Sequence, residues 1–69
     1  VDDALSYYLK AAEASDNDFT SPRYFMKHGL LAMMNGKKEA ALKSFKTIKE
    51  KYSTSSEAAN IDGYIARVE

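Results

Sequence analysis

Residues 22–55 read PRYFMKHGLLAMMNGKKEAALKSFKTIKEKYSTS. Small or apolar residues recur there at three- and four-residue spacing, first Phe25, Gly29 and Ala32, then Ala41, Phe45 and Ile48. This spacing matches the helical period and predicts two amphipathic helices, over about 22–35 and 38–52. Asn35 and Gly36 lie between them and form a turn-prone pair. We therefore expect one of the two to adopt the left-handed conformation that ends many helices.

Apolar residues keep the helical period on both sides of this stretch. Before it the pattern contains Ala4, Leu5, Tyr8, Leu9, Ala11 and Ala12, and after it Ala58, Ile61, Tyr64, Ile65 and Val68. These patterns predict helices over about 1–15 and 56–68. No stretch shows the alternation of a strand. The fold class we expect is therefore all-α, with four antiparallel helices joined by short links.

Polar residues indicate where two of these helices begin. We expect Ser21 to cap the second helix and Pro22 to occupy its first position. Ser55 or Ser56 should cap the fourth helix. Phe19 is an apolar residue within the first connection, and we expect it to pack onto the core.

Length and composition describe a small folded domain. The 69 residues are 45% hydrophobic and 29% charged, which is typical of a folded chain rather than a disordered one. A core of this size gives only marginal stability by itself. The chain has no Cys to form a disulfide and only one His, which is too few for a cluster of metal ligands. The formal net charge of zero does not support nucleic-acid binding, and the longest apolar run is too short to span a membrane.

The chain repeats itself internally. Gly29 and Gly63 are 34 residues apart, each in the middle of a predicted helix, where glycine costs about 1 kcal/mol relative to alanine. We expect both to allow the close approach of a neighbouring helix backbone. The pattern Ala4-Leu5-x2-Tyr8-x2-Ala11 recurs as Ala41-Leu42-x2-Phe45-x2-Ile48, at an offset of 37 residues. We infer the second helix of one unit with its connection (1–21), a complete unit (22–55) and the first helix of the next (56–69).

These repeat positions resemble the tetratricopeptide repeat family, whose pattern places an aromatic and Leu-Gly in one helix, then Ala-x3-Phe and Pro in the next. The matching residues are Phe25, Gly29, Gly36 at the turn, Ala41, Phe45 and Gly63, whereas His28, Ala32, Ser53, Ala59 and Asp62 depart from the pattern. The resemblance implies a fragment of an α-solenoid. Residues 51–55 also resemble an ending found in bacterial envelope proteins of this family. The narrower likeness is to the C-terminal part of a Bacteroidetes-type member, which implies the cell envelope or periplasm.

In this family the first helices of successive pairs line a concave face that binds a peptide or a helix. By helical phase, the resemblance assigns that face to Arg23, Met26, Lys27, Leu30, Met33 and Met34, and to Asn60, Tyr64 and Arg67, with Glu57 and Ile61 in the same phase. It implies a non-catalytic scaffold for a protein or peptide partner. Arg23 and Lys27 are four residues apart and therefore spaced to pair a carboxylate of that partner. Leu30 stands where a carboxylate clamp of this family has asparagine.

Plainer interpretations of these residues stay open. Arg23 and Lys27 also suit a solubilising surface. The methionines suit packing against a further helix pair as well as a promiscuous apolar groove. We interpret the lysines of the predicted helix 38–52 as a solvated face; they are Lys43, Lys46, Lys49 and Lys51. The alternative function is a structural spacer or oligomerisation module of a larger envelope protein.

His28 is the only histidine and lies among apolar residues. Because zinc needs three or four ligands, we interpret His28 as a packing residue and expect no metal site. We also expect no cofactor and no catalysis. Repeat units bury their faces only on their neighbours, so we expect exposed apolar surface on the two end helices and self-association through it. The residues concerned are Tyr7, Tyr8 and Leu9 at one end and Ile61, Tyr64 and Ile65 at the other.

Overall fold

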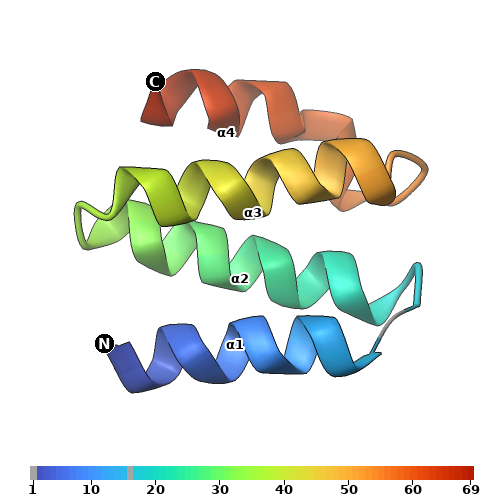
Figure 1. Ribbon diagram of the computed structural model, residues 1–69. Coiled ribbons are helices and arrows are strands. Elements are labelled where there is room, and N and C mark those ends of the chain that lie inside the picture. The colour runs from blue at the N-terminus through green and yellow to red at the C-terminus, as the bar shows by residue number, and fades with distance from the viewer. Residues whose placement is uncertain (1, 16) are drawn as a thin grey trace.

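The computed structural model describes residues 2–15 and 17–69, and within these ranges the chain forms helices and no strand (Figure 1). The helices are α1 (Asp2–Ser15), α2 (Thr20–Met34), α3 (Lys38–Lys51), the 3₁₀ turn η1 (Glu57–Asn60) and α4 (Ile61–Val68). Successive helices run antiparallel and lie side by side in chain order, each in contact with the next. The all-α class predicted from the sequence is confirmed.

The start of α2 differs from its predicted form. Asn17, not Ser21, caps the free N–H groups, because its Oδ1 accepts hydrogen bonds from Phe19 N and Thr20 N at 3.0 and 2.6 Å. Ser21 is buried, and its Oγ donates to the carbonyl of Ala12 at 2.8 Å. The serine predicted to cap α2 instead ties α2 to α1.

Two neighbours of this cap also differ from their predicted places. Pro22 is the third residue of α2 rather than the first, since the helix begins at Thr20. Proline is tolerated there because an N–H in the first turn has no intrahelical acceptor. Phe19 is 84% exposed, so the prediction that it packs onto the core is wrong.

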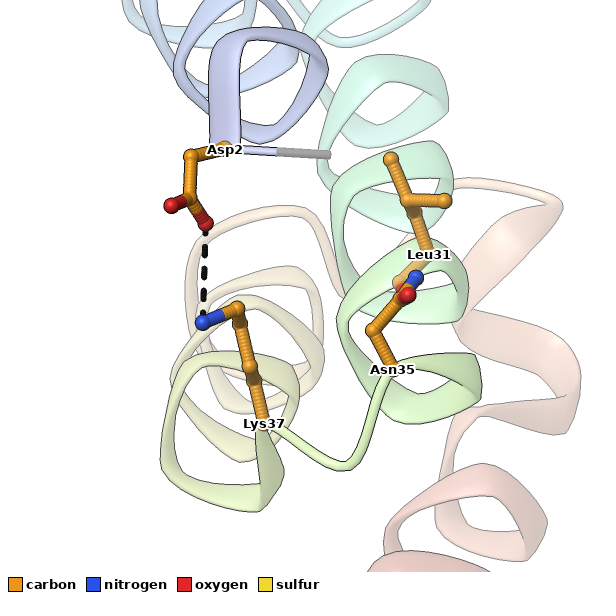
Figure 2. A network of polar contacts seen from close by, with 4 residues as sticks. All are labelled: Asp2, Leu31, Asn35 and Lys37. Atoms are coloured by element: carbon orange, nitrogen blue, oxygen red, sulfur yellow. Dashed lines mark hydrogen bonds and ion pairs between the residues drawn. The ribbon is translucent and has the colours of Figure 1, made fainter.

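The turn between α2 and α3 has the predicted conformation. Gly36 has φ +74°, in the left-handed region. Lys37 N donates to the carbonyl of Ala32 at 2.8 Å and Gly36 N to that of Met33 at 3.2 Å, which is the Schellman pattern of a helix C-terminus. Figure 2 shows the side chains around this turn. Asn35 Nδ2 donates to the carbonyl of Leu31 at 2.8 Å, and Lys37 forms an exposed ion pair with Asp2 of α1 at 3.5 Å.

The last helix begins later than predicted. Residues 57–60 form a 3₁₀ turn, and the α-helix starts at Ile61 rather than near residue 56. Of the two candidate capping serines, Ser55 accepts a hydrogen bond, from Ala58 N at 3.2 Å. A short 3₁₀ turn at a helix start is common because it pairs backbone groups that the α-helix leaves unbonded.

The core lies between the successive helices. Its buried apolar residues are Leu5, Ala12, Phe25, Ala32, Ala41, Phe45, Ile48, Ile61, Ile65 and Val68. Phe45 is completely buried, between Gly29 on α2 and Tyr64 on α4, whose ring centroid lies 5.6 Å from that of Phe45. A Cβ atom placed on Gly29 would lie 2.5 Å from the Phe45 ring. The close approach at Gly29 therefore comes from an aromatic ring and not, as predicted, from a helix backbone.

Gly63 and the end helix correct two further predictions. Apart from its own stretch of helix, no atom of residues 2–15 and 17–69 lies within 4 Å of a Cβ placed on Gly63, so no other described element approaches it closely. Ile61 and Ile65, predicted to be exposed at the end of the stack, are buried in the core. The phase of α4 therefore turns its branched side chains inward and leaves Gly63 on its outer surface. At the other end, Tyr7 is 62% exposed, while Tyr8 and Leu9 are half-buried.

Candidate functional site

The predicted binding face on α2 begins at Arg23. This residue is exposed and lines a pocket of about 350 Å³ together with Glu57 of η1 and residues from both adjoining connections. The other lining residues are Asp18, Phe19, Thr54, Ser55 and Ser56. The predicted binding face consists of two stripes of side chains, one on α2 and one on η1 and α4. Since α2 and η1 are in contact, the two stripes meet at this pocket.

The remaining α2 residues of the predicted face differ in their exposure. Met26, Leu30 and Met33 are half-buried against the core, whereas Met34 is 78% exposed. The ammonium of Lys27 lies 6.0 Å from the centroid of the Tyr8 ring, at the outer limit of a cation–π contact. Lys27 therefore leans toward α1 rather than toward Arg23.

The α4 part of the face gathers into one pocket of about 400 Å³. It is lined by Asn60, Tyr64 and Arg67 from the predicted set, and by Ala59, Asp62 and Gly63. The Arg67 guanidinium carbon lies 5.5 Å from the Tyr64 ring centroid, so the cation covers the ring. The structure thus brings these three predicted residues together, and places Arg23 and Lys27 at separate positions along α2.

A further pocket, of about 670 Å³, lies elsewhere, between α1 and α3 over α2. Its lining residues are Leu9, Glu13, Phe25, His28, Ala40, Lys43, Ser44, Thr47, Lys51 and Tyr52. Sequence reasoning missed it and interpreted the lysines of α3 as a solvated face. A signal was present, because Ser44 is a polar residue on the apolar stripe of Ala41 and Ile48.

His28 and Ser44 form a buried polar pair beneath this pocket. His28 Nδ1 and Ser44 Oγ are hydrogen-bonded at 2.5 Å, with either group able to donate according to the imidazole tautomer. Ser44 is 2% exposed, and burial lowers the pKa of His28. A serine nucleophile needs an accessible hydroxyl and a base that a third group orients. The pair is better explained as a polar link between α2 and α3, as expected of a packing histidine.

Acidification should destabilise the fold through His28. Its pKa in the folded chain is lowered below the ordinary 6.5 by burial, so the unfolded chain binds the proton more readily. The stability that this group contributes is fully present above 6.5 and is lost as the pH falls from there through the folded pKa. We expect a lower melting temperature at pH about 5 than at pH about 7.5, and a smaller difference for His28→Gln. An unchanged difference in that variant would assign the effect to other groups.

No group of three or more His, Cys, Asp or Glu residues able to hold a metal ion occurs in the ranges 2–15 and 17–69. Within the same ranges, none of the helices has the length and apolar character needed to cross a bilayer. Comparison with family models, curated proteins and solved structures finds no match to this chain.

Proposed function

We propose that this chain is a non-catalytic protein-interaction scaffold of the tetratricopeptide repeat type, in which the outer stripes of α2 and α4 bind a peptide or helix. The observation that carries the proposal is the junction of the two stripes. Arg23 of α2 and Glu57 of η1 line one pocket, and α2 and η1 are in contact. A ligand that crosses this junction touches both helices, which is how stacked helix pairs build an extended binding surface.

The side chains on these stripes indicate the chemistry of the partner. Three cations, Arg23, Lys27 and Arg67, are exposed along them. Met34 adds an exposed, flexible apolar side chain, and such residues adapt to varied partners. The partner that fits is a segment that carries both carboxylates and apolar side chains.

Binding should depend on the cations of α2. A panel of displayed random peptides is selected on the wild-type chain, and the Kd of each selected peptide is then measured for Arg23→Glu with Lys27→Glu. Hydrogen bonds to charged groups contribute about 1.5–3 kcal/mol, so we expect Kd to rise by roughly 10- to 100-fold. The matched control is Lys43→Glu with Lys46→Glu, which makes the same charge change on α3 and should leave Kd within about twofold.

Selected peptides that bind the Arg23→Glu, Lys27→Glu chain as tightly as the wild type would remove these residues from the site. Loss of binding in the α3 control as well would show that overall charge, not the stripe, decides affinity. Both variants alter exposed side chains, so their folding can be checked against the wild type by far-UV circular dichroism.

A second candidate function is structural, as a spacer or oligomerisation module. The specific observation in its favour is that, within residues 2–15 and 17–69, α1 and α4 each have exposed residues on the side away from the neighbouring helix. The exposed residues include Tyr7 on α1 and Gly63 on α4. Repeats of helices stack most stably when such end faces are covered.

A further inference from the structure

We propose that copies of this chain assemble head to tail, with α1 of one copy packing on α4 of the next in the register in which α3 packs on α2. The inference rests on the second candidate function, and the contact would cover the Gly63 pocket, which Asn60, Tyr64 and Arg67 of the proposed peptide-binding surface also line. It identifies the occupant of the α4 surface as a second copy of this chain. Four features of the structure support it: the α2–α3 contact, the partly covered Tyr8 ring, the uncovered Gly63 surface and the charges on α1 and α4.

The contact between α2 and α3 provides the template. The Phe45 ring lies directly on Gly29, where a single added Cβ would reach it. On its other side it lies against Tyr64 of α4. Two helices cover the ring, and Phe45 is therefore fully buried.

On α1 the equivalent ring has only one of these two covers. Tyr8 corresponds to Phe45 at the 37-residue offset. Its ring faces α2 through Lys27, whose ammonium lies 6.0 Å from the ring centroid, yet Tyr8 is only half-buried. Within residues 2–15 and 17–69, the helix that packs on α1 is α2, whereas α3 packs on both α2 and α4. Its neighbour Tyr7 is 62% exposed.

On α4 the position equivalent to Gly29 has no aromatic ring packed on it. Gly63 corresponds to Gly29 at the 34-residue offset, and no atom of another described element lies within 4 Å of its Cβ position. A pocket of about 400 Å³ surrounds it, lined by Tyr64, Arg67 and four other residues. An aromatic ring placed on Gly63 would bury apolar surface on both helices, as the Phe45 ring does on Gly29.

The charges at the proposed contact are complementary. The template places Ser44 and Thr47 beside His28, since Ser44 is hydrogen-bonded to it and all three line one pocket. At the 37-residue offset Ser44 and Thr47 correspond to Tyr7 and Lys10 on α1, and at the 34-residue offset His28 corresponds to Asp62 on α4. A second copy would therefore bring a phenol hydroxyl and an ammonium to the Asp62 carboxylate.

Asp62 can accept both groups. Its side chain is 77% exposed, and one carboxylate oxygen is 2.8 Å from Lys49 Nζ, in an ion pair at the surface. A carboxylate has lone pairs for about four hydrogen bonds, so further donors can bind without breaking that pair. Lys10 is the one basic residue of α1, whose other charged residues are acidic.

Such a contact joins the α1 surface of one copy to the α4 surface of the next. Every open complex therefore keeps one free α1 surface and one free α4 surface. Heterologous contacts of this kind form rings when the rotation closes and open filaments when it does not. The proposal therefore predicts association that continues beyond a dimer. A symmetric contact between two α4 surfaces would instead stop at the dimer.

The experiment blocks each surface separately. Gly63→Leu fills the space above Gly63 on α4, and Tyr7→Glu places a carboxylate opposite Asp62. Both positions are exposed, so the fold should be retained. Sedimentation velocity is measured for each variant alone and for an equimolar mixture. The wild type should exceed the 7.7 kDa monomer mass increasingly with concentration, each variant alone should stay monomeric, and the mixture should form a dimer and nothing larger.

A charge exchange tests the register. Lys10→Glu and Asp62→Lys should each weaken wild-type association by about tenfold or more, and the double variant should recover most of it, because the pair is restored with its signs reversed. Lys46→Glu on α3 is the control and should have no effect. Recovery in the double variant supports the register, and its absence overturns it.

Two outcomes separate the inference from the function on which it rests. If the wild type associates but Gly63→Leu associates equally well, the α1–α4 contact is wrong and oligomerisation stands. If the wild type remains monomeric at millimolar concentration, both are overturned. Peptide binding has its own test, through Arg23 and Lys27 on α2.

Discussion

Truncating Phe45 to alanine lowers the free energy of unfolding by about 3–5 kcal/mol, the range for removing a large aromatic residue from a well-packed core. Phe45 is completely buried, between Gly29 and Tyr64, so the truncation leaves a cavity that helices on both sides border. Native domains are stable by about 5–15 kcal/mol, and a chain of 69 residues lies toward the lower end. We therefore expect a large unfolded fraction at room temperature.

Urea denaturation followed by far-UV circular dichroism measures this effect. Met34→Ala is the matched control, because Met34 is 78% exposed on α2 and its truncation should change stability by no more than about 0.5 kcal/mol. Phe45→Leu should lie between the two, since leucine refills part of the space. A Phe45→Ala variant as stable as Met34→Ala would show that this ring does not hold α2, α3 and α4 together.

The helices were predictable because their signals are local. Apolar spacing over 22–35 and 38–52 reflects the helical period directly, and Asn35–Gly36 specifies its turn through the left-handed preference of glycine. The start of α2 was not predicted correctly, because several polar residues compete there. Asn17 takes the cap and Ser21 bonds across to Ala12, nine residues away, which no local rule distinguishes from capping.

The candidate site was less predictable because it depends on the relation between helices. Helical phase placed Asn60, Tyr64 and Arg67 on one face of the predicted last helix, and the structure gathers them, from η1 and α4, in one pocket. Phase alone did not show that Ser44 reaches His28, sixteen residues earlier, because that contact needs the antiparallel register of α2 and α3. The same limit applies to Ile65, whose inward orientation is set by packing on α3.

The two glycines at repeat positions should respond to alanine with opposite signs. At Gly29 the added methyl meets the Phe45 ring at 2.5 Å, and that ring is fully buried and cannot move aside cheaply. Overpacking costs about 1–3 kcal/mol, partly offset by the roughly 1 kcal/mol that alanine gains as a helix former, so Gly29→Ala should destabilise by up to about 2 kcal/mol. At Gly63 nothing opposes the methyl, and Gly63→Ala should stabilise by about 0.5–1 kcal/mol.

Thermal melts at low protein concentration, where self-association does not contribute, measure both effects. About 1 kcal/mol corresponds to roughly 4–8 °C in a domain of this size, so the two variants should differ clearly in melting temperature. Introducing Phe45→Leu identifies the cause. A shorter side chain relieves the clash, so Gly29→Ala should cost less in that background, while the gain from Gly63→Ala should stay the same. An equal cost of Gly29→Ala in both backgrounds would place its origin in the backbone of α2 and not in the ring that lies on it.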